Sequence, residues 1–165
     1  EFARQARQDP LTAIANRRAF DEALDREYAR ARRGGGSMSI ALVDIDHFKA
    51  INDRHSHAVG DEVLRRVAAY LQSACRGFDL VARWGGEEFA LLLPETSRPT
   101  ARAICERLRV GLAALDLGDL APGLRLTASF GVADAATSDN RHRLLQDADE
   151  ALYRAKANGR NRVEG

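Results

Sequence analysis

At 165 residues, with 45% hydrophobic and 30% charged side chains, the chain has the length and composition of one globular domain with a sizeable core. Its net charge of +1 argues against a dominant electrostatic grip on a nucleic acid polymer or an anionic membrane. Because no apolar run approaches the roughly 20 residues that span a bilayer, no signal-peptide pattern opens the chain and the two cysteines lie far apart, we expect a reduced, cytoplasmic setting without a disulfide framework.

The chain opens with a polar segment and continues into an amphipathic helix. Residues 1–8 favour a helix without an apolar face, so we interpret them as the end of an N-terminal linker helix before a domain over residues 9–165. Asn16 is a suitable N-cap for the next helix, which the glycines after residue 33 end. Its apolar stripe consists of Phe20, Leu24, Tyr28 and Ala31. Arg17 and Arg18 lie in its first turn, where the helix dipole disfavours positive charge, so we expect an acidic partner such as Asp9.

A buried strand and two helices are predicted next. The apolar run over residues 39–45 is typical of a strand that is covered on both faces. A short helix is indicated over residues 47–55. A longer helix is predicted to begin at Gly60-Asp61 and to be closed by Gly77.

Residues 80–94 are predicted to form a β-hairpin, because two apolar runs flank a Gly-Gly pair. We expect Gly85 and Gly86 to provide the positive φ angles of its turn. Glu87 and Glu88 follow directly. Since successive strand residues point to opposite faces, only one of these two acids can face a given site.

The last part of the chain completes a mixed fold. The pattern predicts a helix over residues 97–115, a loop over 117–123, a strand over 124–133 with Gly131 as a bulge, a helix that Gly159 ends, and a short strand over 160–163. Strands that alternate with helices but include a hairpin predict an α/β fold of α+β type, a mixed, mostly antiparallel sheet with helices on its faces.

Acidic side chains gather at two of the predicted strand ends. Asp44 and Asp46 end the buried strand, and Glu87 and Glu88 follow the hairpin turn. If these strands are neighbours, two carboxylates at about 4 Å repel each other by about 4 kcal/mol at an effective dielectric of about 20. A cation would relieve this repulsion, and all-oxygen ligation suits Mg²⁺ or Mn²⁺. The residues alone leave a pair of solvated turn acids open as the alternative.

Basic and polar residues form two further groups. Lys49 follows the acidic strand end, while Lys156 and Arg160 share a helix face if the last turn holds. Near a metal they suit phosphate oxygens, and a favourable charge at a helix C-terminus is the alternative. Asn52 and Asp61 together can read the edge of a guanine, or they are ordinary residues of helix starts.

The run Gly85-Gly86-Glu87-Glu88-Phe89 resembles the GGEEF form of the signature of the GGDEF family of diguanylate cyclases. The resemblance extends over about residues 9–163. It includes Asp9-Pro10-Leu11-Thr12, Asn16-Arg17-Arg18, Asp44-Ile45-Asp46-His47-Phe48-Lys49, Asn52-Asp53, Gly60-Asp61, Arg83-Trp84 and Ala155 through Asn161. It implies a fold related to the palm of nucleotidyl cyclases and polymerases, and the condensation of two GTP into cyclic di-GMP and two pyrophosphates. Since each domain holds one GTP, it also implies an antiparallel homodimer.

The resemblance also implies roles for single residues. Mg²⁺ or Mn²⁺ would be held by Asp44, Glu87 and the Ile45 carbonyl. The catalytic candidates are Glu87, Glu88 and Lys49. The candidates for GTP binding are Phe48, Asn52, His57, Asp61, Gly85, Gly86, Lys156 and Arg160, with Asn52 and Asp61 at the guanine.

A second, inhibitory site is implied before the hairpin. Arg76 and Asp79 match the RxxD pattern at which the product cyclic di-GMP binds, and Arg107 offers a further contact. Read without the resemblance, the first two are a helix C-terminal arginine and a turn aspartate. The resemblance further implies an N-terminal sensory or regulatory domain in the parent protein, and it is compatible with tethering of that parent to the inner membrane.

The chain departs from the family pattern at a few positions. Ala13 replaces a usual glycine, and Ser56 and Ala58 stand where glycine and aspartate are common. Two other functions stay open: a non-catalytic cyclic di-GMP receptor that uses Arg76 and Asp79, and a dimerisation module that binds no nucleotide.

Overall fold

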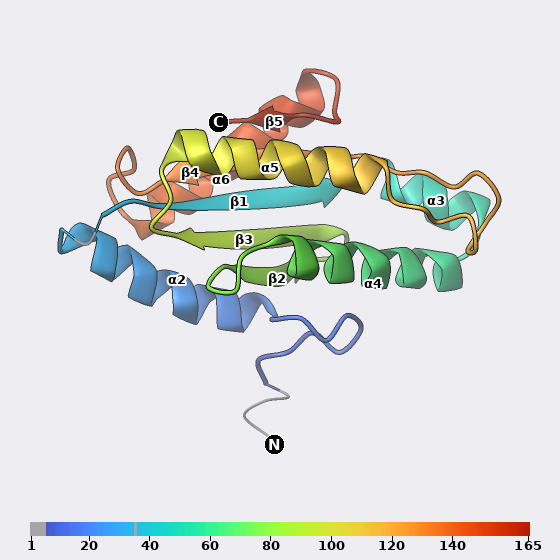
Figure 1. The fold of residues 1–165 in the computed structure, drawn as a ribbon, viewed down its shortest axis with the longest axis horizontal. Helices are drawn as coiled ribbons and strands as arrows, with labels where there is room; N and C mark the ends of the chain where they lie inside the picture. Colours follow the sequence, from blue (N-terminus) through green and yellow to red (C-terminus); the bar gives the residue numbers. More distant parts are fainter. Residues whose placement is uncertain (1–5, 35) are drawn as a thin grey trace.

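The computed structural model describes residues 6–34 and 36–165. Its strands form one sheet in the order β2-β3-β1-β4-β5 (Figure 1). The strands are β1 Met38–Ile45, β2 Leu80–Gly85, β3 Glu88–Pro94, β4 Ala128–Asp134 and β5 Val163–Glu164. Central β1 is antiparallel to both β3 and β4, β2 is antiparallel to β3, and β5 is parallel to β4. The prediction of a mixed, mostly antiparallel sheet is therefore confirmed.

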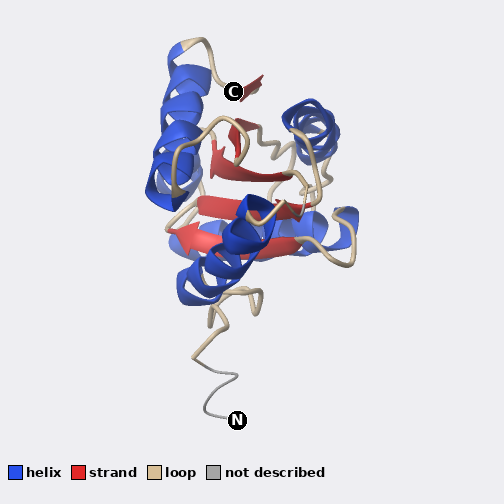
Figure 2. Ribbon diagram, turned by 90° about the vertical axis from the view of Figure 1, so that its left-hand side faces the viewer, coloured by secondary structure: helices blue, strands red, loops and turns tan. Residues whose placement is uncertain are grey.

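Helices cover both faces of this sheet (Figure 2). They are α2 Arg17–Arg32, α3 Phe48–Arg54, α4 His57–Ala74, α5 Arg98–Ala113 and α6 Arg141–Ala157. One hydrophobic core lies between the sheet and α4 and α5, and a second lies between the sheet and α2 and α6. Strand β1 is buried over its whole length because Ala41 and Val43 belong to the first core while Ile40 and Leu42 belong to the second.

Strand β4 differs from its prediction in two ways. It begins at Ala128, so residues 124–127 are not part of it. Gly131 is not a bulge, because it pairs in register with Leu42 on one side and Glu164 on the other. A Cβ added at Gly131 would lie 2.3 Å from the Ala148 carbonyl oxygen. The glycine is required because the backbone of α6 packs directly against β4.

The start of one helix and the bounds of the last strand also differ from the predictions. Helix α4 begins at His57, three residues before Gly60, because the Ser56 hydroxyl accepts a hydrogen bond from the Val59 amide at 3.1 Å and caps the helix there. Helix α6 ends at Ala157 and Gly159 follows with a positive φ of 124°, as predicted, whereas the strand expected over 160–163 is instead Val163–Glu164. Arg160 and the residue after it adopt left-handed φ angles of 63° and 48° instead.

The segment before α2 crosses the free edge of the sheet. Residues 6–8 form a turn and a bridge from Gln8 to Ala15 rather than a helix, and residues 1–5 of the predicted linker helix lie outside the described residues. Ala15 in turn pairs with Ala82 of β2.

The expected pairing of the two arginines at the start of α2 with Asp9 is wrong. The Arg17 guanidinium packs over the Trp84 ring at 4.0 Å, and Arg18 pairs with Glu22 at 3.4 Å. Asp9 pairs with Arg83 at 3.2 Å. Trp84 lies in β2, which the position of Arg17 in a helix turn does not reveal, whereas Glu22 is one turn further along α2 itself.

Within residues 6–34 and 36–165, no helix combines the length and the apolar character that a membrane crossing requires. Cys75 and Cys105 are free thiols. Cys105 is buried in α5, where burial raises the pKa of its thiol.

Candidate active site

The predicted acidic and basic residues meet at one end of the sheet. There the end of β1, the β2–β3 turn, the start of α3 and the segment after α6 come together, on the right of Figure 1. A cavity of about 170 Å³ is lined by Asp44, Ile45, Asp46, His47, Phe48, Lys49, Glu87, Lys156 and Arg160. Residues that are more than 100 positions apart in the sequence thus share one site.

Asp44 is a buried carboxylate of this cavity that forms an ion pair with Lys156. It is 6% exposed, and its Oδ2 accepts a hydrogen bond from Lys156 Nζ at 2.5 Å. Burial raises the pKa of Asp44; the bond to Lys156 lowers it, and the negative charges of Glu87 and Asp46 raise it further. Lys156 therefore offsets only part of the cost of burying the Asp44 carboxylate.

The two signature glutamates take different positions. Glu87 lies in the turn and lines the cavity, whereas Glu88 lies directly opposite Asp44 in the β1–β3 ladder. Burial raises the pKa of Glu88, and the charge of Asp44 raises it further while Lys156 lowers it. Glu87 lines the cavity itself, and Glu88 lies close enough to Asp44 and Lys156 to feel their charges.

The two signature glycines have a different role from the one expected. Neither Gly85 nor Gly86 has a positive φ angle, so the turn does not need them for a left-handed conformation. A Cβ added at either position would meet nothing within 4 Å. The backbone here is open to whatever approaches the turn from outside.

Arg83 holds this turn, a role that was not predicted from the sequence. Its Nε and Nη2 donate to the Gly86 carbonyl oxygen at 3.1 and 2.8 Å, and its Nη1 donates to the Asp9 carboxylate. Its place three residues before a glycine turn was the available signal. Its partner Asp9 lies 74 positions away, which no local pattern indicates.

The donor set fits a hard divalent cation that shares its coordination with a phosphate. Among residues 6–34 and 36–165, no group of three or more His, Cys, Asp or Glu side chains is arranged to hold a metal. The cavity offers two crowded carboxylates, Asp44 and Glu87, and the Ile45 backbone. Mg²⁺ is commonly bound by one or two carboxylates together with substrate phosphates and water, so these donors suffice.

Three basic side chains, those of Lys49, Lys156 and Arg160, line the same cavity. Lys49 is exposed, and no hydrogen bond or ion pair to it occurs within the described part of the chain. The spacing of Lys156 and Arg160 predicted that they share a helix face. This is wrong, because α6 ends at Ala157, before Arg160. It reaches the cavity from the left-handed turn that follows the helix.

The predicted guanine-reading residues lie where α3 meets the start of α4. Among the described residues, Asn52 Oδ1 is one of two buried side-chain polar atoms without a hydrogen-bond partner. A Cβ added at Gly60 would lie 1.7 Å from this oxygen and 3.3 Å from Phe48 Cζ. Position 60 must therefore be a glycine for the Asn52 side chain to adopt this position. Asp61 and His57 are exposed on the first turns of α4.

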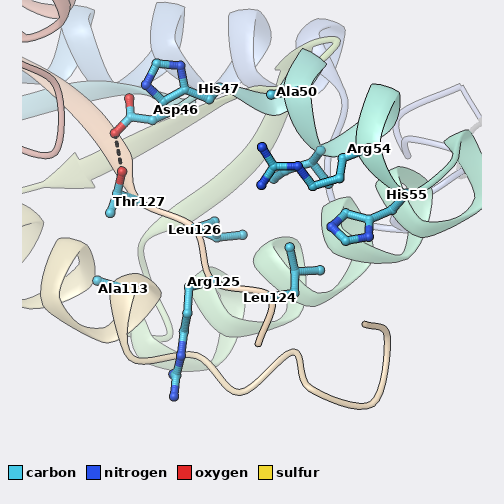
Figure 3. A pocket seen from close by; sticks show the side chains of 11 residues that line it. Asp46, His47, Ala50, Arg54, His55, Ala113, Leu124, Arg125, Leu126 and Thr127 are labelled. Atoms are coloured by element: carbon cyan, nitrogen blue, oxygen red, sulfur yellow. Dashed lines mark hydrogen bonds between the residues drawn. The ribbon is translucent and has the colours of Figure 1, made fainter. Parts of the chain in front are cut away.

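A larger cavity of about 430 Å³ lies elsewhere, between α3, the end of α5 and the segment before β4 (Figure 3). Arg54 and His55 point toward its wall of Leu124 and Leu126, while Arg125 points away. None of the candidate catalytic, GTP-binding or metal residues lines it; it shares only Asp46 and His47 with the smaller cavity. The larger cavity therefore lacks the paired acids and bases of the smaller one.

The predicted inhibitory residues form a compact group after α4. Arg76 binds the Asp79 carboxylate with two hydrogen bonds of 2.9 Å and also donates to Thr96 Oγ1 at 2.7 Å. The Arg76 guanidinium packs over the exposed Phe78 ring at 4.6 Å. Arg107 donates to the Ala74 carbonyl oxygen at 2.9 Å.

The sheet thus carries at one end carboxylates that could hold a cation and basic side chains that could bind phosphate oxygens. The chain belongs to the family described as "Diguanylate cyclase, GGDEF domain", whose profile matches residues 6–162. It is similar to the diguanylate cyclase DgcP of Pseudomonas aeruginosa, with 44% identity over 94% of this chain and 23% of that protein. It is likewise similar to the response regulator PleD of Caulobacter vibrioides, with 45% identity over 95% of this chain and 35% of that protein. The chain thus spans about a quarter to a third of the length of these relatives.

Solved structures agree with this assignment. The coiled coil and GGDEF domain of DgcB from Caulobacter crescentus, in complex with c-di-GMP, superposes with a TM-score of 0.92 at 37% identity, covering 99% of this chain and 87% of that one. The active GGEEF domain of a diguanylate cyclase from Vibrio cholerae superposes with a TM-score of 0.86 at 34% identity, covering 92% of this chain and 96% of that one. The prediction of a GGDEF-type fold is confirmed.

Proposed function

We propose that the chain is the catalytic domain of a diguanylate cyclase, which condenses two GTP into cyclic di-GMP and two pyrophosphates. The observation that carries this proposal is the cavity at the end of β1, in which the buried Asp44 lies with Glu87 and three basic side chains. The names of the curated relatives support the same activity.

In this proposal Asp44, Glu87 and the Ile45 carbonyl hold Mg²⁺ or Mn²⁺. When bound, the cation stabilises the negative charge that develops on the transferred phosphate. Lys49, Lys156 and Arg160 bind phosphate oxygens through charge-assisted hydrogen bonds. The backbone of Gly85 and Gly86 leaves open space in which phosphate groups can lie.

The guanine is read between α3 and α4. Asn52 Oδ1 is a buried acceptor without a partner, which an N–H group of the base would satisfy, and Asp61 accepts from the same edge. Phe48 and His57 lie beside them and complete the candidate pocket. Leaving such an acceptor unsatisfied costs about 1–3 kcal/mol, which a bound base would recover.

The reaction joins two domains. The 3′-hydroxyl of one GTP attacks the α-phosphate of the other in line, and pyrophosphate leaves. Because each domain holds one GTP, two copies pair antiparallel in the active state. Glu88 remains a catalytic candidate because it lies opposite Asp44 in the sheet. We place the reaction in the cytoplasm, where GTP is available, under the control of an N-terminal sensory or regulatory domain.

The test is to incubate the protein with GTP and Mg²⁺ or Mn²⁺ and to separate the nucleotides by chromatography. We expect cyclic di-GMP and pyrophosphate, with a rate per domain that rises with protein concentration. Glu87→Gln should abolish turnover, whereas Glu95→Gln, just beyond the other end of β3, should not. GTP that stays unchanged at every protein concentration would contradict the proposal.

Product binding at Arg76 and Asp79 is a second, separable function. The observation that favours it is the Arg76 guanidinium, which packs over the exposed Phe78 ring beside a bidentate carboxylate. A planar guanidinium of this kind can stack on a purine and pair with it, with Arg107 as a further contact. We expect calorimetry to detect cyclic di-GMP binding that Arg76→Ala abolishes. Unchanged binding by this variant would exclude both an inhibitory site and a receptor function here.

A further inference from the structure

Asp46 lies two residues after Asp44, yet its surroundings are entirely different. It is 6% exposed, and no ammonium or guanidinium group of the described residues pairs with it. Its oxygens instead accept hydrogen bonds from the Thr127 hydroxyl at 2.7 Å, the Ser129 hydroxyl at 2.7 Å and the Asn161 backbone amide at 3.0 Å. Figure 3 shows the bond to Thr127. Both oxygens of this carboxylate therefore already accept hydrogen bonds from groups of the protein.

The bond to the Asn161 amide reaches an unusual part of the backbone. Arg160 and Asn161 are two consecutive residues with left-handed φ angles, which a residue with a Cβ adopts only at an energetic cost. Such a turn persists only when its surroundings hold it. The Arg160 amide donates to the Ala155 carbonyl oxygen at 2.9 Å, and Asp46 holds the next amide along the chain.

A second contact holds the same turn from the outer side. Arg109 of α5 donates from Nη1 to the Asn161 side-chain oxygen at 2.7 Å. Its Nε and Nη2 are held by the Glu106 carboxylate at 2.9 and 2.6 Å. Asn161 is therefore fixed by its backbone to the end of β1 and by its side chain to α5.

We infer that Asp46 is a positioning residue that directs Arg160 into the phosphate cavity, with Arg109 as an outer support. The turn it holds is what brings Arg160 beside Asp44, Glu87 and Lys156, because the helix itself has already ended. This inference rests on the proposed function, in which Arg160 binds phosphate.

Asp46→Ala and Asp46→Asn distinguish positioning from a role for charge. Alanine removes both acceptor oxygens and with them all three hydrogen bonds. Asparagine can keep accepting from the Asn161 amide, while the Ser129 hydroxyl turns to accept from the new amide group. We expect Asp46→Ala to raise the KM for GTP about tenfold, the scale of one lost hydrogen bond to a charged acceptor, and Asp46→Asn to restore most of that loss. Equal defects in both variants would mean that the negative charge itself is required, and would overturn the inference.

A double-mutant cycle shows whether Asp46 acts through Arg160. In an Arg160→Ala background, Asp46→Ala should change the KM for GTP less than twofold, because the side chain that it positions is gone. A tenfold effect that persists in this background would refute the inference. Asp134→Ala is the matched control: Asp134 is also buried, at the far end of β4, and accepts from Thr137. It should lower stability without changing the KM for GTP.

A measurement that needs no turnover keeps the outcome separate from that of the proposed function. Amide hydrogen exchange at Asn161 should accelerate at least about tenfold in Asp46→Ala and not in Asp134→Ala, whether or not the protein turns over GTP. Unchanged exchange would refute the positioning role, while an inactive wild-type protein would refute only the cyclase proposal.

Should Asp46→Ala fail to fold, Arg109→Ala removes the outer contact at a partly exposed position. It should raise the KM for GTP by a smaller factor that also vanishes without Arg160, and an unchanged KM would count against the inference.

Discussion

Replacing Gly131 by alanine should be among the most damaging single-methyl additions to this domain. The new Cβ would lie 2.3 Å from the Ala148 carbonyl oxygen and 2.3 Å from the Leu152 amide nitrogen. Ordinary contacts of a carbon atom begin near about 3.5 Å, so α6 would have to withdraw from β4 by about 1 Å. Both obstructing groups are backbone and cannot rotate away. We therefore expect a loss of about 3 kcal/mol in the free energy of unfolding, the upper end of the usual range for overpacking.

The assay is urea unfolding of the variant beside two other glycine-to-alanine replacements. At Gly111 the added Cβ would meet the hydroxyl end of Tyr70, which can swing aside, and at Gly77 it would meet nothing within 4 Å. Both should stay within about 1 kcal/mol of the wild type. In a thermal melt, 3 kcal/mol corresponds to a fall of about 6–12 °C for a domain of this size.

The position has a consequence for the site as well. Helix α6 carries Lys156 and β4 lies beside β1, which carries Asp44. A displaced α6 should therefore weaken the Lys156–Asp44 ion pair in addition to the core. If Gly131→Ala is as stable as Gly111→Ala, the close packing of α6 on β4 is not the reason for this glycine.

Three further outcomes are expected. Ala13→Gly should raise the free energy of unfolding by about 0.5–1 kcal/mol in a denaturant titration, because Ala13 holds a φ of 64°, and a lower value would contradict this reading. Asp9→Asn should lower the free energy of unfolding by about 1–2 kcal/mol at pH 7. Burial raises the pKa of Asp9, but hydrogen bonds from Thr12 and Arg83 outweigh burial and lower this pKa below 3.8. That contribution is complete above pH 3.8 and is lost as the pH falls through the lower folded value, so urea titrations should show the deficit shrinking below about pH 4 and not above. Iodoacetamide at pH 8 should modify Cys75 more slowly than it modifies a cysteine in a short unfolded peptide. Burial, and after it the charge of Asp79, raises the pKa of the Cys75 thiol to about 11. Labelling as fast as that of the peptide would refute this.

The elements of this fold could be predicted because they are written in local patterns. The two apolar runs of residues 80–94 and the run before Asp44 follow from the burial of whole strands, and the stripe that includes Phe20 and Leu24 follows from burial at the helical period. The acids and bases of the cavity were identified because the signature places them at the ends of those elements. Their assembly at one end of the sheet follows from the strand order.

The remaining features depend on contacts between distant positions. Asp46 meets Asn161 across 115 positions, and Arg83 meets Asp9 across 74, so no window of sequence contains either pair. Gly131 looked like a bulge because the helix that packs on it is not visible from the strand alone. Gly85 and Gly86 were expected to need positive φ, whereas the structure uses their lack of a side chain and not their backbone freedom.

The pairing of Ala15 with Ala82 also bears on how the domain avoids self-association. Strand β2 is at the edge of the sheet, and an uncovered edge presents unpaired amides and carbonyls to any other strand. The Ala15 carbonyl oxygen accepts from the Arg83 amide at 2.9 Å and so occupies part of that edge. A protein trimmed to begin at α2 would keep the helices and the cavity but would lose this cover. Its failure would be aggregation through β2 before any loss of fold.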